Sequence, residues 1–173
     1  MATKNNQGNM PNAHLHELFT EELKDILGAE RQLLKGLKKM AGVANNQKLT
    51  EAFETHYQQT EGQIERLKTV FSGLGMAARG KKCKAMEGLL EEADEIASDF
   101  QDSPEVLDAA LISAAQKVEH YEIASYGCLV TYAKLMGHTE AQELLAATLA
   151  EEKETDELLT MIATEEANTQ GAS

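Results

Sequence analysis

Apolar residues recur every three or four positions along most of this chain, which is the spacing of an α-helix that buries one of its faces. Short stretches containing Gly, Ser or Asn interrupt the repeat and indicate where helices end. The composition agrees, because Ala, Leu, Glu, Lys and Gln dominate and all favour helix. We predict helices over about residues 14–40, 47–74, 83–97, 103–136 and 139–162.

Several of these boundaries carry residues that commonly cap helices. Gly42 is predicted to end the first helix and Gly137 the fourth, because glycine adopts the backbone conformation that closes a helix. Ser103 precedes a proline and is a predicted N-cap of the fourth helix. Thr139 and Gln142 have the spacing of a capping box at the start of the fifth helix.

The lengths of the connections predict how the four long helices are arranged. Short turns should fold the first two helices and the last two helices into antiparallel hairpins, whereas a long connection joins the hairpins and can run back along the bundle. The predicted fold is therefore all-α, a ferritin-like four-helix bundle whose crossover contains the short third helix. It occupies residues 13–166 as one domain, and the polar residues 1–12 and 167–173 are predicted to be flexible tails.

Polar residues interrupt the apolar face of each long helix near its middle. Residues equidistant from the turn of a hairpin lie side by side, so Glu30 should lie beside about residue 59 and Glu122 beside about residue 154. Both hairpins then place their carboxylates at the same height, and their packing would bring these residues into one chamber. The interrupting residues are Glu30, His56, Thr60, Gln63, Glu122, Ser125, Thr148, Glu152 and Thr155.

Several carboxylates and an imidazole in a buried chamber repel one another unless a cation neutralises them. Oxygen-rich ligands with a histidine suit Fe or Mn. Di-iron bundles use a Glu from each of two helices and a Glu-x-x-His from each of the other two, but Phe53 and Thr155 occupy two of those positions here. Glu119, three residues before Glu122, lies toward the edge of the apolar face and could turn inward as a further ligand.

The same residues also permit a structural interpretation. His56 could be a hydrogen-bonded core histidine, and the Thr and Ser residues could bond back to their own helices. Tyr121 could fill the core, or it could donate a hydrogen bond behind the ligands. The matching heights favour a metal site. Its predicted ligands are Glu30, His56, Glu119, Glu122 and Glu152, and its predicted supporting residues are Thr60, Gln63, Tyr121 and Thr155.

Three segments resemble a known family. HYQQTEGQIERLKTVF, AAQKVEHYEIASYG and LAATLAEEKETDELLTMIA are similar to the bacterial YciE/YciF-type ferritin-like proteins, and the resemblance extends over about residues 14–166. It implies a ferritin-like bundle, often dimeric, that acts in stress responses. It also implies two iron ions at the five predicted ligands and oxidation of Fe(II) by dioxygen or peroxide.

Net charge and cysteine content limit the kinds of binding partner and cellular compartment that we expect. Sixteen Lys and Arg against 29 Asp and Glu give a net charge of −13, which disfavours binding to nucleic acid or anionic membranes. The basic stretch at 79–84 is interpreted as a solvated loop. Two cysteines without a CxxC pair fit a reducing compartment, and neither a leader nor a membrane span is evident, so we expect a soluble cytoplasmic protein.

These observations predict a metal-binding protein that has metal ions and dioxygen or peroxide as partners and forms a homodimer. Iron is the expected cofactor, with manganese as an alternative. In the competing hypothesis, the chain is a non-catalytic structural or interaction protein whose buried polar layer fixes the register of its helices.

Overall fold

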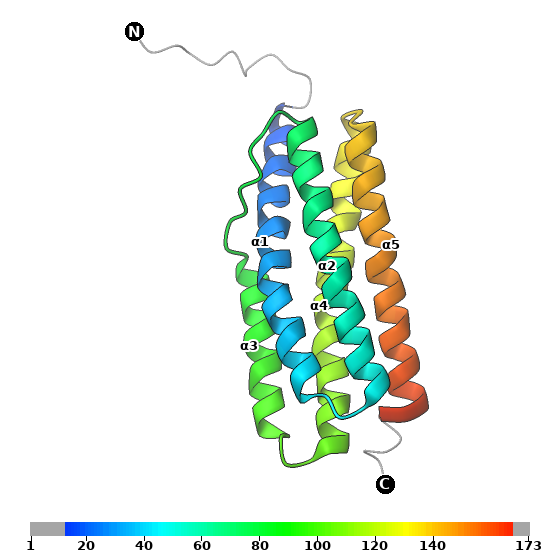
Figure 1. Cartoon of the computed structure of the whole chain (residues 1–173). Helices are drawn as coiled ribbons and strands as arrows, with labels where there is room; N and C mark the ends of the chain where they lie inside the picture. Colours follow the sequence, from blue (N-terminus) through cyan, green and yellow to red (C-terminus); the bar gives the residue numbers. More distant parts are fainter. Residues whose placement is uncertain (1–12, 168–173) are drawn as a thin grey trace.

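The computed structural model describes residues 13–167, and in this range all of the regular secondary structure is helical. Four long helices form a bundle, and a shorter one packs outside it against the first and fourth (Figure 1). The predicted all-α, ferritin-like bundle is confirmed, whereas most of both predicted tails lies outside the described residues. The elements are α1 (Ala13–Val43), α2 (Gln47–Gly73), α3 (Lys84–Asp99), α4 (Pro104–Leu135), α5 (Thr139–Ile162) and a π-helical turn, η2 (Ala163–Ala167).

The predicted crossover is also present. After α2, the chain runs back along the outside of α1 before it enters α3, so that α2 and α4 run in the same direction (Figure 1). The amide of Lys81 donates to the carbonyl of Lys24 over 2.9 Å, which attaches the crossover to α1. Side chains 79–82 are exposed, as expected for a solvated loop, but Cys83 is buried and its Sγ caps α3 by accepting from the amide of Met86.

A glycine permits the close approach of the crossover to α1. A Cβ added to Gly28 would lie 1.6 Å from the carbonyl oxygen of Lys81, which is far inside van der Waals contact. Only glycine therefore allows the crossover to lie directly on this turn of α1. Since Gly28 lies two residues before Glu30, the same contact covers the helix close to a predicted ligand.

Gly28→Ala should lower the free energy of unfolding by about 1–3 kcal/mol, because the crossover must move away from α1. Gly62→Ala is the matched control, since Gly62 is an exposed glycine inside α2 with nothing within 4 Å of an added Cβ. It should raise stability by about 0.5–1 kcal/mol, because alanine is the better helix former. Urea unfolding of the two variants measures both changes, and equal effects would contradict this explanation.

The helix ends follow the predictions in part. Gly137 has φ +74° and closes α4 in a Schellman motif, in which His138 N donates to Ala133 O over 2.9 Å. Gly42 does not end α1, which continues to Val43. Ser103 is the N-cap of α4 but makes no side-chain capping bond.

The predicted capping box at the start of α5 is wrong. Thr139 is the first residue of the helix, and His138 occupies the N-cap without a side-chain capping bond. The ring of His138 instead stacks on Phe19, with 6.0 Å between ring centroids. Packing against α1 therefore decides the position of this turn by burying an aromatic ring rather than by satisfying the first amides of α5.

A buried aspartate attaches the first hairpin to the second. Asp108 of α4 is 4% exposed, and its two carboxylate oxygens accept from the amides of Asn45 and Asn46, both over 2.8 Å. These amides belong to the turn between α1 and α2. The hairpins are thus held together at this end of the bundle by two charge-assisted hydrogen bonds.

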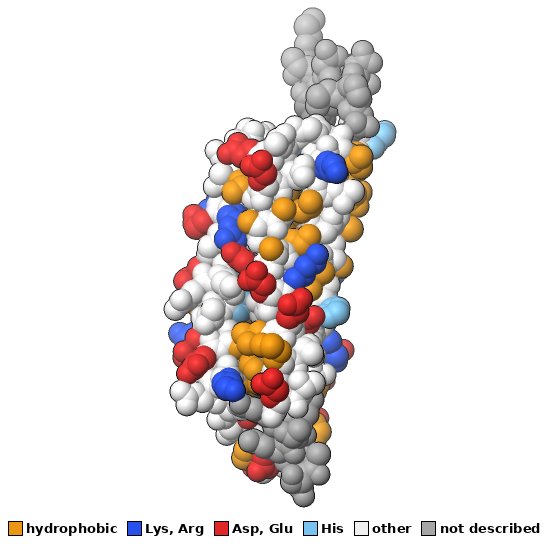
Figure 2. Space-filling view, turned by 90° about the vertical axis from the view of Figure 1, so that its right-hand side faces the viewer, with side chains coloured by type: hydrophobic (Ala, Val, Ile, Leu, Met, Phe, Trp, Pro, Cys, Tyr) orange, Lys and Arg blue, Asp and Glu red, His pale blue; other side chains and the backbone are white. Residues whose placement is uncertain are grey.

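The outer surface mixes both signs of charge with apolar side chains. The face on the right of Figure 1, seen directly in Figure 2, carries dispersed acidic and basic groups with apolar groups between them. On α5, Leu158 and Met161 are 37% and 52% exposed. In the part of the chain that the structure describes, no helix is both long and apolar enough to cross a bilayer.

Candidate metal centre

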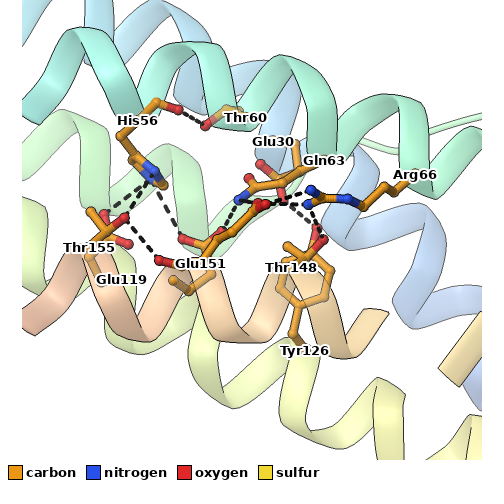
Figure 3. Close-up of polar contacts among 11 residues, drawn as sticks. Glu30, His56, Thr60, Gln63, Arg66, Glu119, Tyr126, Thr148, Glu151 and Thr155 are labelled. Atoms are coloured by element: carbon orange, nitrogen blue, oxygen red, sulfur yellow. Dashed lines mark hydrogen bonds and ion pairs between the residues drawn. The ribbon is translucent and has the colours of Figure 1, made fainter. Parts of the chain in front are cut away.

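Buried polar side chains from all four long helices meet at the middle of the bundle, between apolar layers above and below. The five predicted ligands are at most 1% exposed, although each lies on a helix that presents many other acidic residues to solvent. One donor atom from each of four of them lies within 4.8 Å of the others. This group consists of His56 of α2, Glu119 and Glu122 of α4 and Glu152 of α5, and Glu30 of α1 lies beside it. Figure 3 shows His56, Glu119 and Glu30 at this place.

The imidazole of His56 faces two of the carboxylates. Its Nε2 lies 3.3 Å from Glu119 Oε1 and 3.6 Å from Glu152 Oε2. Its Nδ1 lies 3.5 Å from the hydroxyl of Thr155, which donates its single proton to the carbonyl of Glu151 over 3.0 Å. Thr155 can therefore only accept from Nδ1–H, and a neutral His56 presents the lone pair of Nε2 to the chamber.

Two of the carboxylates are held by one oxygen and leave the other towards the chamber. Glu30 Oε1 accepts from the hydroxyl of Tyr126, and Glu152 Oε1 accepts from the amide nitrogen of Gln63. In the described part of the chain, Oε2 of both residues has no donor, nor has Glu119 Oε2 or either oxygen of Glu122. Nε2 of His56 likewise has no hydrogen-bond partner among the described residues. Buried polar atoms are normally hydrogen-bonded, so six such atoms at one place indicate a missing positive partner.

The pKa values of the chamber residues are shifted by burial and by the neighbouring carboxylates. Burial raises the pKa of Glu30 to about 7. Burial, followed by the charges of neighbouring carboxylates, raises the pKa of Glu122 and of Glu152 well above the usual range. Burial alone would lower the pKa of His56, but the charges of Glu119 and Glu30 raise it above its ordinary value. A chamber without a cation therefore retains protons.

Comparison with known proteins identifies the family. The chain matches the DUF892 family, described as a domain of unknown function, over residues 14–172. It belongs to the DUF892 family. It is 48% identical to protein YciF of Escherichia coli K12 over 155 residues, which cover 89% of this chain and 93% of YciF. The predicted resemblance to YciF-type proteins is thus confirmed.

Two solved structures share the fold of this DUF892 chain. The crystal structure of the E. coli stress protein YciF superposes with a TM-score of 0.82 at 47% identity, and the match covers 89% of this chain and 97% of that one. YcfI of Rhodopseudomonas palustris, provisionally described as a structural protein, also gives 0.82, at 42% identity over 84% and 92% of the two chains.

Two of the four predicted supporting residues contact ligand side chains in the DUF892 bundle. Gln63 donates to Glu152, and Thr155 faces the ring of His56. Thr60 is buried but bonds back to the carbonyl of His56 in its own helix over 2.8 Å, as in the structural interpretation. Tyr121 does not reach the ligands. Its hydroxyl lies 3.0 Å from Asp25 Oδ2 and 3.1 Å from Cys83 Sγ, because it projects about 100° around the helix from Glu122, towards α1 and the start of α3.

The predicted inner face of α4 is wrong at Ser125, although Leu129 is buried as predicted. We expected Ser125 on the inner face, but the structure buries Tyr126, and the Ser125 hydroxyl bonds back to Tyr121 O over 2.8 Å. Tyr126 is fully buried because its ring packs in the core while its hydroxyl reaches Glu30. Its spacing of four from Glu122 is the signal that could have identified it.

Arg66 and Glu151 were also absent from the predicted site. They form an ion pair between α2 and α5 next to Gln63, and both side chains are partly exposed. The available signal was the spacing of three between Gln63 and Arg66, which places both side chains on the same side of α2.

The donor set fits a hard or intermediate divalent cation. One imidazole and four carboxylates would surround it, and this combination suits iron or manganese better than copper or a thiolate-bound metal. Neither oxygen of Glu122 accepts a hydrogen bond from a described residue, so this residue could offer two ligand atoms. Phe53 is a buried core residue at the position where di-iron bundles place another glutamate, and this leaves the α2 side with His56 as its only ligand.

Proposed function

We propose that this chain is a ferritin-like metal-binding protein that holds two iron ions, with manganese as an alternative, at Glu30, His56, Glu119, Glu122 and Glu152. The observation that carries this proposal is the convergence of six buried ligand atoms that have no hydrogen-bond partner in the described part of the chain. Because those atoms come from all four long helices, a bound cation would replace repulsion at the middle of the bundle by attraction.

The proposal includes oxidation of Fe(II) by dioxygen or peroxide, for which bound iron would supply the electrons. The chain itself prepares the ligands. Thr155 holds His56 with Nε2 towards the chamber, while Tyr126 and Gln63 each hold a carboxylate by its outer oxygen. The apolar layers on both sides exclude water. By extension from the stress protein YciF, we propose that this function belongs to a stress response. We also propose that the protein is a cytoplasmic homodimer.

Calorimetric titration of the full chain with Fe(II) and with Mn(II), without oxygen, tests the proposal. We expect saturable binding of two ions per chain, and a loss of at least about tenfold in affinity in Glu122→Gln, because this carboxylate has both oxygens open to the ions. Glu61→Gln is the control, since Glu61 is an exposed carboxylate on α2. Air added to the Fe(II) complex should produce the absorbance of Fe(III). A folded wild type that binds neither ion would falsify the proposal.

A structural role is the second candidate. Hydrogen bonds across the polar layer join α1 to α4 and α2 to α5, through Tyr126 with Glu30 and Gln63 with Glu152. Such bonds can fix helix register without any ligand. This candidate predicts that neither ion changes the melting temperature, whereas the metal-binding proposal predicts an increase with metal concentration.

A further inference from the structure

An ion pair between α2 and α5 stands directly behind one of the proposed ligands. The guanidinium of Arg66 makes two parallel hydrogen bonds to the carboxylate of Glu151, with Nη1 2.6 Å from Oε2 and Nη2 on Oε1 (Figure 3). The two side chains are 30% and 23% exposed, so water competes only partly for this contact. A two-point contact fixes the orientation of both groups and not only their separation.

The oriented carboxylate of Glu151 reaches into the polar layer through Gln63. Its Oε2 accepts from Gln63 Nε2 over 3.1 Å, and the same nitrogen donates to Oε1 of Glu152. The amide nitrogen of Gln63 thus lies between two carboxylates. If the amide turned over, its carbonyl oxygen would face both of them, so the charge of Glu151 keeps the donor end of Gln63 on Glu152.

We propose that Arg66 and Glu151 are positioning residues, which act through Gln63 to keep Oε2 of Glu152 directed at the bound metal. The inference rests on the proposed function, because it concerns the same centre. Neither residue hydrogen-bonds to a proposed ligand, but each link restricts the next: the guanidinium holds Glu151, Glu151 holds the amide of Gln63, and the amide holds the outer oxygen of the ligand. Outer contacts of this kind commonly set metal affinity.

Two other roles for the same pair make different predictions. If the pair only holds α2 against α5, its loss would lower the stability of the metal-free protein but not the metal affinity of the folded chain. The contact of Arg66 with Thr148 over 3.3 Å fits such a structural role. For Arg66, a purely electrostatic role has the opposite sign from ours: it is a cation near a cation site, so its removal would tighten metal binding. Glu151→Gln would weaken binding in both cases, so the sign of the Arg66→Ala effect separates the two roles.

The test measures Mn(II) affinity of the full chain from the EPR signal of free Mn(II), at a temperature where every variant is folded. We expect Arg66→Ala and Glu151→Gln each to weaken binding by about tenfold. The double variant should lose little more than either single one, because the two residues act in series. Arg66→Lys should lie between wild type and Arg66→Ala, since lysine cannot make the two-point contact.

Lys68→Ala is the matched control, because it also removes a positive charge from α2 but breaks only the exposed pair with Glu65. Its Mn(II) affinity should equal that of wild type. The visible spectrum of bound Co(II) provides a second readout, which should change in Arg66→Ala and Glu151→Gln if the orientation of Glu152 has changed. Urea unfolding of the metal-free variants measures separately how much the ion pair contributes to stability.

Unchanged affinity and spectrum in Arg66→Ala, with or without a loss of metal-free stability, would overturn the positioning role. Tighter binding would overturn it in favour of the electrostatic one. Both results leave the proposed function intact, because they require a wild type that binds Mn(II). A folded wild type that binds neither Fe(II) nor Mn(II) would instead remove the proposed function, and the positioning role with it.

Discussion

Free Mn(II) at 1,000 times its dissociation constant should raise the free energy of unfolding of the wild-type chain by about 4 kcal/mol for each independent site. Binding stabilises only the folded state, because the five ligands come from four helices and meet only when the bundle is assembled. The physical source of the gain is the replacement of carboxylate repulsion by attraction to the ion. Urea unfolding with Mn(II) and with a chelator measures the difference.

Glu122→Gln should abolish most of this increase, since Gln keeps the shape of the side chain but removes the charge that the ions require. In the metal-free state the same variant should be at least as stable as wild type, because it no longer buries a carboxyl that resists ionisation. Glu61→Gln should behave as wild type with and without metal. An equal increase in all three proteins would show that Mn(II) stabilises the chain from another place.

The metal-free protein should lose stability as the pH rises from 5 to 8. Glu30 has its pKa raised from 4.5 to about 7 in the folded state, so between these values the folded state binds a proton that the unfolded state has released. Stability then falls with pH, by about 3 kcal/mol over this window for Glu30 alone. The raised pKa of His56 acts in the same direction above its unfolded value.

Urea unfolding at several pH values in the presence of a chelator measures this slope. Glu30→Gln should make the slope shallower between pH 5 and 7, because the amide has no proton to lose, while Tyr126 can still donate to the amide oxygen. The raised pKa values of Glu122 and Glu152 retain the rest of the slope. Saturating Mn(II) should also flatten the slope, since ligands that hold an ion are already deprotonated. A metal-free wild type whose stability rises steadily from pH 5 to 8 would contradict the buried, proton-retaining chamber.

Much of the fold and the heights of the polar residues could be predicted from the sequence. Helical periodicity and two short turns place Glu30 and His56 at matching heights in one hairpin, and Glu122 and Glu152 in the other. These features depend on residues close together along the chain. The helix ends were less accurate: Gly137 was identified correctly, whereas α5 begins without the expected capping box, because the aromatic contact of His138 with Phe19 decides that turn.

Local spacing along the chain is enough to predict two helical hairpins with buried acidic residues at mid-height, because it sets the periodicity of each helix and the register across each short turn. The rotation of each helix about its axis depends instead on how the two hairpins pack together. Tyr126 meets Glu30 across 96 positions, whereas Tyr121 turns away to Asp25 and Cys83. Such contacts, like the pairing of Arg66 with Glu151, arise when the two hairpins pack together, and spacing within a single helix resolves its inner face only to about one residue.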